Sequence, residues 1–303
     1  MSSKRIINAE AISQQGVAAN ASFQLGLTKG ADPMHLKVAT LVKSSTAKVE
    51  YSWLGKFPRI REWVGDRILN QLKAHTYTIT NKSYENTVTI DRDEMEDDTV
   101  GLFAPIFQEM GQEVADFPSE LVFSLLRRGQ SELCYDGQFF FDVDHPVTDA
   151  AGQVQLVSNW QGGTGDLWVV AATSRALKPI ILQVRRPFEN VMLDRPDDPN
   201  VFMRKEYIYG CDGRMNVGFG FWQFAIGSRL PLTPDNFKAA VASLENMVGD
   251  GGRPLGLKPD LLITTPSNRS AGQQLLETML GDGGKSNEWY KFCELAVTPW
   301  MKG

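Results

Sequence analysis

The clearest hydrophobic pattern in the chain lies between Phe103 and Leu125. Apolar residues follow one another there at intervals of 4, 3, 4, 3, 4 and 4 residues, the spacing of a single buried stripe on a helix. Two arginines and a glycine at residues 127–129 form a typical helix end. The pattern predicts a long helix over residues 99–129, and Pro118 inside it predicts a kink or a division into two helices.

A second pattern, of period two, precedes this helix. Tyr77 and Ile79, and later Val88 and Ile90, alternate with threonines and charged residues on either side of Asn81-Lys82-Ser83. Such alternation around an asparagine-led turn predicts a β-hairpin. Because a two-stranded ribbon is marginal alone in water, we expect it to lie on a second surface.

The remaining patterns divide the chain into an arm and an α/β end. The first 44 residues are polar and rich in small residues, which predicts an arm without a core of its own. Strands are expected at 177–184 and 207–224. After residue 233 the chain alternates between predicted helices (235–248 and 267–280) and predicted strands (260–264 and 294–300).

Composition excludes several classes of function. The 303 residues are 42% hydrophobic and 22% charged, with a net charge of −5, so a nucleic-acid binder driven by a large basic excess is excluded. No apolar run spans a bilayer, and the N-terminal residues do not form a signal peptide, which indicates a cytoplasm-like compartment. Three widely spaced cysteines predict small buried side chains rather than disulfides or zinc ligands. We expect no cofactor.

One cluster of possible metal ligands stands out. Asp142, Asp144 and His145 could bind a metal and support a metal-dependent hydrolase. That function needs further ligands and a base from elsewhere, and a polar turn before Pro146 is the simpler interpretation. Enzyme chemistry is therefore not predicted.

Aromatic and basic residues alternate around Pro58, a composition typical of protein interfaces and also of base-stacking surfaces. Six acids among residues 91–98 and the acidic balance of the chain favour a protein interface. Together with the predicted hairpin, the candidates for contact between subunits are Trp53, Arg59, Arg61, Trp63, Tyr77, Ile79, Lys82, Tyr84, Val88 and Ile90.

Several short segments, taken together, resemble the major head subunit family of Mu-like bacteriophages and prophages, from about Gly26 onward. They include Trp53-Leu54-Gly55, Arg61-Glu62-Trp63, Met95-Glu96-Asp97-Asp98, Cys134-Tyr135-Asp136-Gly137-Gln138, Asp144-His145-Pro146-Val147 and Gly218-Phe219-Gly220. The resemblance implies an α+β chain with the Hong Kong 97-type phage capsid fold. It implies an N-terminal arm (1–44), an extended β-hairpin loop (45–98), a peripheral domain with a spine helix (99–232) and an axial α/β portion (233–303).

The resemblance also implies a function. A major capsid protein of this family assembles with itself into hexamers and pentamers that form the icosahedral head shell around phage DNA, in the host cytoplasm. The implied partners are a scaffolding protein, a portal and decoration proteins, with only weak, non-specific contact to the packaged double-stranded DNA. No membrane partner is expected.

Overall fold

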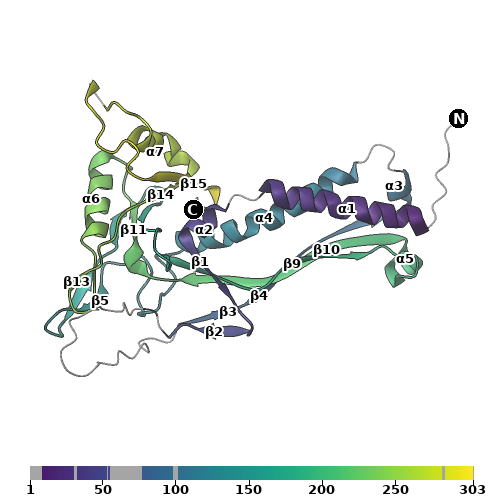
Figure 1. Ribbon diagram of the computed structural model, residues 1–303, viewed down its shortest axis with the longest axis horizontal. Helices are drawn as coiled ribbons and strands as arrows, with labels where there is room; N and C mark the ends of the chain where they lie inside the picture. The colour runs from purple at the N-terminus through teal and green to yellow at the C-terminus, as the bar shows by residue number, and fades with distance from the viewer. Residues whose placement is uncertain are drawn as a thin grey trace. The chain divides into compact units, whose positions relative to one another are not determined.

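The computed structural model describes residues 9–30, 33–52, 54, 77–97, 102–281 and 284–302 (Figure 1). The chain divides into two compact units and passes between them several times. Unit 1 comprises residues 1–33, 81–118 and 184–216, and unit 2 comprises residues 34–80, 119–183 and 217–303. The sequence-based expectation instead drew each domain as one continuous stretch.

Unit 1 combines long helices with long antiparallel strands. Its elements, three of which continue into unit 2, are α1 (Ala9–Gly30), β4 (Lys82–Asp91), α3 (Arg92–Asp97), α4 (Phe103–Arg127), β9 (Ile180–Leu193), α5 (Pro199–Arg204) and β10 (Glu206–Phe219). The antiparallel pair β4 and β10 runs without interruption from Glu206 opposite Asp91 to Met215 opposite Lys82. The apolar stripe of α4 is buried in this unit, where Phe107 and Met110 are each 4% exposed.

Unit 2 is built on a five-stranded sheet in the order β15-β14-β8-β11-β7. Its strands are β7 (Trp160–Gly163), β8 (Trp168–Ala171), β11 (Ala225–Arg229), β14 (Leu261–Thr264) and β15 (Glu294–Val297). Every residue of β8 and β14 is buried, as expected for central strands covered on both faces. Helix α6 (Pro234–Glu245) packs against β8 and β11, and α7 (Arg269–Leu276) packs against β14 and β15.

Smaller elements complete unit 2. They are α2 (Met34–Val38), β1 (Ala39–Lys43), β2 (Lys48–Glu50), β3 (Thr78–Thr80), β5 (His145–Thr148), β6 (Val154–Val157), β12 (Val248–Gly249), β13 (Arg253–Pro254) and three 3₁₀ turns (Trp222–Phe224, Pro266–Asn268 and Pro299–Met301). Strand β1 belongs to a four-stranded sheet in the order β1-β9-β10-β4, whereas β2–β3, β5–β6 and β12–β13 each form a two-stranded sheet.

The structure corrects the predicted hairpin. β3 and β4 do not pair with each other around Asn81, because β3 pairs with β2, with Glu50 opposite Thr78, and β4 pairs with β10. Residues 77–80 and 82–91 are therefore consecutive strands of two different sheets. Alternation predicted both strands, but it carries no information about their partners.

The structure also decides the question raised by Pro118. Helix α4 continues through this residue to Arg127, so the predicted division into two helices is wrong. The first helix differs from expectation as well, because the N-terminal segment forms α1 over 22 residues. Phe23 of α1 is 3% exposed and joins a cluster with Met110 and Val114 of α4, so the arm shares a core within unit 1.

Candidate functional site

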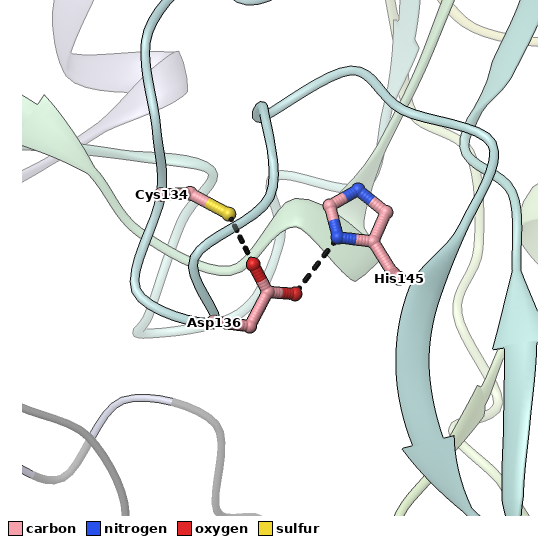
Figure 2. Close-up of side chains that lie close together, drawn as sticks. All are labelled: Cys134, Asp136 and His145. Carbon is pink, nitrogen blue, oxygen red and sulfur yellow. Dashed lines mark hydrogen bonds and ion pairs between the residues drawn. The ribbon is translucent and has the colours of Figure 1, made fainter.

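Three side chains that could bind a metal converge within unit 2, as Figure 2 shows. Asp136 lies in a tight turn made possible by Gly137, whose φ of 88° favours glycine. The Cys134 thiol donates to Oδ1 of Asp136 at 2.9 Å, and Nδ1 of His145 lies 2.8 Å from Oδ2. The imidazole is fully buried and the carboxylate is 4% exposed.

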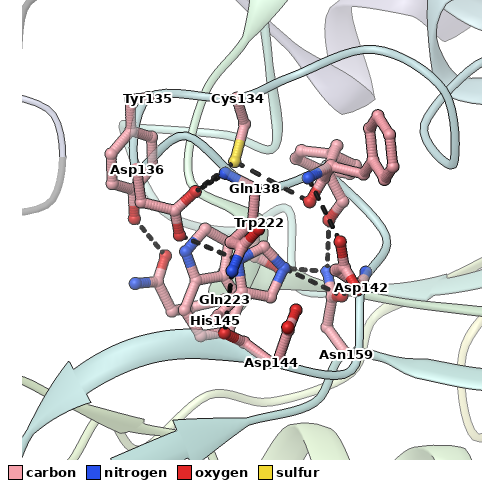
Figure 3. A network of polar contacts seen from close by, with 12 residues as sticks. Cys134, Tyr135, Asp136, Gln138, Asp142, Asp144, His145, Asn159, Trp222 and Gln223 are labelled. Atoms are coloured by element: carbon pink, nitrogen blue, oxygen red, sulfur yellow. Dashed lines mark hydrogen bonds and ion pairs between the residues drawn. The ribbon is translucent and has the colours of Figure 1, made fainter. Parts of the chain in front are cut away.

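Asn159 completes this network on the other side of the imidazole (Figure 3). Its Nδ2 donates to the carbonyl oxygens of Phe140 and Trp222, at 2.8 and 3.3 Å. Its Oδ1 accepts from the backbone N–H of Asp142 at 3.0 Å and lies 3.2 Å from Nε2 of His145. These contacts fix the amide orientation, so His145 faces an oxygen that can only accept.

The geometry determines where the protons of the buried pair lie. Because Nε2 of His145 faces the Asn159 oxygen, Nε2 carries a proton, and the contact between Nδ1 and Asp136 needs a second one. Asp136 and His145 therefore form a buried hydrogen-bonded pair that shares this second proton. Trp222 stacks on the imidazole with ring centroids 3.8 Å apart, a geometry that favours a cation. Burial opposes ionisation of Asp136, but hydrogen bonds from His145 and Cys134 outweigh it and lower the pKa of the carboxyl.

The same contacts decide against a metal centre. The ligand atoms of Cys134, Asp136 and His145 lie within 4.8 Å of one another, and zinc accepts all three residue types. However, Asp136 already accepts from the thiol, from the Gln138 N–H at 3.1 Å and from the imidazole. Burial and the Asp136 charge raise the pKa of Cys134, which keeps the thiol protonated. We interpret the network as a set of hydrogen bonds that stabilises the fold around β5.

The residues of the hydrolase hypothesis do not form one site, because Asp142 and Asp144 lie close together but His145 has other partners. Oδ1 and Oδ2 of Asp142 accept backbone N–H groups of Val143 and Phe139, at 2.7 and 3.3 Å. His145 turns to Asp136 and Asn159 instead. Within the described ranges, the group of potential ligands around His145 contains neither Asp142 nor Asp144.

Comparisons with known proteins identify the family. The model of the Mu-like prophage major head subunit gpT matches residues 12–301. The major capsid protein of Escherichia phage Mu is 45% identical over 247 residues, which are 80% of this chain and 81% of that protein. The FluMu prophage major head subunit of Haemophilus influenzae is 39% identical over 249 residues, 80% of each chain.

The chain belongs to the Mu-like major head subunit family. Among solved structures, a chain of the bacteriophage JBD30 procapsid superposes with a TM-score of 0.85 at 40% identity, covering 97% of this chain and 100% of that one. A chain of the JBD30 capsid superposes with a TM-score of 0.75 at 30% identity, covering 88% and 90%.

Membership confirms the family, the Hong Kong 97-type fold and the function predicted from sequence. A major head subunit is a structural protein of the virion capsid, so the hydrolase alternative has no support. No helix among the described residues has the length and apolarity needed to cross a membrane.

The predicted contact residues of this head subunit fall into two groups. Four of them, Trp53, Arg59, Arg61 and Trp63, lie outside the described residues. The other six lie in or beside β3 and β4, and the structure uses most of them within the subunit.

Ile79 and Ile90 are each only 3% exposed, and the Tyr77 hydroxyl accepts the Phe219 N–H at 2.9 Å. Tyr84 packs edge-on against Phe117, with ring centroids 4.6 Å apart. Val88 is partly buried and packs against the two hydrophobic clusters of unit 1, whereas Lys82 is exposed. Spacing could not reveal this burial, because the covering residues come from distant parts of the chain.

Sequence reasoning also missed most of the polar network. His145 was considered only as a metal ligand beside Asp142 and Asp144, and Cys134 only as a small buried side chain. Asp136 was noted only within a short segment, and Asn159 and Trp222 were not connected with these residues. The one available signal was a histidine close to an aspartate in a turn-rich stretch. A partner that is 63 residues from Asn159, such as Trp222, becomes visible only in the fold.

Proposed function

We propose that this head subunit forms rings of six and rings of five, which together close into an icosahedral shell. The observation that carries this proposal is the similarity to a procapsid chain over 97% of the present chain, at 40% identity and a TM-score of 0.85. One chain that occupies both kinds of ring needs many weak contacts that tolerate a change of angle.

Exposed apolar side chains supply a driving force for such contacts. In unit 1, Phe202 and Met203 of α5 are 79% and 76% exposed. In unit 2, Leu41 of β1 is 51% exposed, and Met279 and Leu280 after α7 are 63% and 57% exposed. Burial of these side chains between copies would contribute roughly 25 cal/mol per Å² of apolar area.

The ribbon formed by β2 and β3 is proposed to reach a neighbouring copy. In the described part of the chain these two short strands pair only with each other. One face of the ribbon packs within the subunit, where Ile79 is 3% exposed, but the residues of the other face, Lys48, Glu50, Thr78 and Thr80, are exposed. The residues between the two strands include the aromatic and basic candidates Trp53, Arg59, Arg61 and Trp63. Contact with a neighbour would stabilise the ribbon and join the copies.

Further partners are proposed from the relatives. A scaffolding protein and a portal are expected to guide assembly, and minor capsid proteins to decorate the shell, since one JBD30 structure is a capsid decorated with minor capsid protein trimers. Packaged double-stranded DNA is expected to contact the subunit only weakly, because a net charge of −5 gives little attraction to a polyanion.

Electron microscopy of the expressed protein tests the proposal. The wild-type chain should form closed particles with rings of six and five. A variant in which a short turn replaces residues 55–76 keeps the buried Leu54 and Glu50 opposite Thr78, and it should yield folded subunits without particles. A wild-type protein that remains monomeric at every concentration would contradict the proposed assembly.

A further inference from the structure

The hairpin of β5 and β6 presents an apolar face to solvent. Its register places Pro146 opposite Leu156 and Thr148 opposite Val154, so these four side chains share one face, here named the outer face. Leu156 is 68% exposed and Val154 is 64% exposed, and Pro146 is also exposed. Two strands with an uncovered apolar face do not stabilise each other strongly.

The opposite face of this hairpin is held firmly. His145 and Val147 of β5 are buried, and His145 belongs to the polar network with Asp136 and Asn159 (Figure 3). At the end of β5, the Thr148 N–H donates to Oδ1 of Asp250 at 3.1 Å. The outer face is therefore held in a fixed orientation. No contact among the described residues depends on this face being exposed to solvent.

The surrounding sequence is acidic without compensation. Residues 129–174 contain six carboxylic acids and no lysine or arginine. Two of the acids, Asp142 and Asp144, directly precede β5. Loss of solvent and the neighbouring Asp142 carboxyl together raise the pKa of Asp144, so the two carboxylates repel each other. A basic and apolar partner would relieve this repulsion and cover the outer face.

The chain itself contains a segment of that character. Residues 55–76 carry five lysines and arginines against two acids, together with Phe57, Trp63 and several aliphatic residues. In a chain with 31 basic and 36 acidic residues, this positive segment is an exception. Complementary charge gives a contact specificity and orientation, while apolar burial gives it most of its strength.

We infer that the outer face of β5–β6 is a docking surface for residues 55–76 of a second copy of this chain. Val154 and Leu156 contribute the apolar contact, and Asp142 and Asp144 face the arginines of the incoming segment. The polar network around His145 positions the surface. This inference rests on the proposed assembly and names its contact partner.

Charge exchange between copies tests the inference. The face variant carries Asp142→Asn and Asp144→Lys, and the asparagine oxygen at position 142 can still accept the Val143 N–H, the shorter of the two backbone contacts of Asp142. The loop variant carries Arg59→Glu and Arg61→Glu. Expressed alone, each should give about ten-fold fewer particles than wild type, because a contact repeated around a ring amplifies a small loss per copy.

Co-expression of the two variants separates contact between copies from contact within one chain. Between copies, the wild-type segment of one variant meets the wild-type face of the other, and the two reversed partners also match. Particle yield should therefore rise several-fold above that of either variant alone, with at least one contact left unmatched in each ring of five because five copies cannot alternate completely. Rescue only when all four changes are in one chain would show that the segment covers its own face, which overturns the inference.

Two further variants distinguish loss of this contact from misfolding and from a general effect of charge reversal. Leu156→Asn removes apolar contact from an exposed position and should reduce particle yield without changing the circular dichroism or melting temperature of the subunit. Lys238→Glu, an exposed charge reversal on α6 elsewhere in unit 2, should assemble normally. Normal particles from the face variant and from Leu156→Asn would overturn the inference alone, whereas absence of wild-type particles would contradict the proposed assembly as well.

Discussion

Two regions of this head subunit achieve close packing by opposite means. In unit 1, α1 crosses α4 through glycines. A Cβ atom added to Gly26 would lie 1.9 Å from the carbonyl oxygen of Gln108, and one added to Gly111 would lie 2.1 Å from that of Phe23. In unit 2, the buried hydrogen-bonded pair of His145 and Asp136, together with Asn159, holds β5 in place.

The two regions are destabilised by different kinds of substitution. The crossing of α1 and α4 depends on the absence of side-chain volume, because backbone atoms already touch. The network around His145 depends on a matched number of donors and acceptors, because a buried polar group that loses its partner remains unsolvated. Stability therefore depends on side-chain volume in the first region and on matched hydrogen-bond donors and acceptors in the second.

The largest effect is expected from His145→Leu. The substitution leaves the Asp136 carboxylate and the Asn159 oxygen buried without their common donor, which should cost about 3–5 kcal/mol. Urea unfolding of the unassembled subunit measures this loss.

A double variant provides the control. Asp136→Leu combined with His145→Leu removes both charges and should be more stable than His145→Leu alone, since no uncompensated charge remains. If the double variant were less stable than the single one, the pair would not be an ion pair.

The next effect tests the helix crossing. Gly111→Leu places a side chain against the Phe23 backbone, so α1 must move away from α4 at a cost of about 1–3 kcal/mol or more. Limited proteolysis should then cleave within residues 9–30 of the variant and should leave this segment intact in the wild type.

Ala18→Leu is the control in α1, the other helix of this crossing. Ala18 is exposed, so the added side chain meets solvent and should change stability by less than about 0.5 kcal/mol. Equal effects of the two substitutions would contradict the proposed role of the glycine crossing.

The sequence predicted elements that carry a strong apolar stripe and missed those that do not. The spacing of Phe107, Met110 and Val114 predicted α4, and all three side chains are buried. Helix α1 has a weaker pattern, because its contact face is formed by Phe23 together with small residues such as Ala19 and Gly26. Small residues leave no hydrophobic signal, although they allow the closest contact in this unit.

The pairing of strands and the composition of the site were not predictable for a related reason. Both depend on residues far apart in sequence. Alternation predicted β4, but only the fold shows that its partner is β10, more than one hundred residues later. Likewise Asp136 and His145 are close in sequence, whereas Asn159 reaches His145 through the folding of a separate strand.

A pH titration sharpens the comparison between the two regions. The lowered pKa of Asp136 means that its carboxylate stabilises the fold above the unfolded value of about 3.9, and that this contribution is lost as the pH falls through the lower folded value. The stability difference between wild type and Asp136→Asn should be constant between about pH 5 and 7 and should shrink below about pH 4. Gly111→Leu should show no such dependence, because the crossing contains no titrating group.

The smallest predicted effect concerns the Cys134 thiol, which distinguishes packing from hydrogen bonding. Burial and the nearby Asp136 charge raise the pKa of the thiol, so at neutral pH it is an S–H donor to Oδ1 of Asp136. Cys134→Ala should therefore cost about 0.5–1.5 kcal/mol in urea unfolding, and Cys134→Ser, which keeps a donor, should cost less. The opposite order would show that the thiol acts only as a small apolar side chain, and that the hydrogen-bond network extends to Asp136 but does not include Cys134.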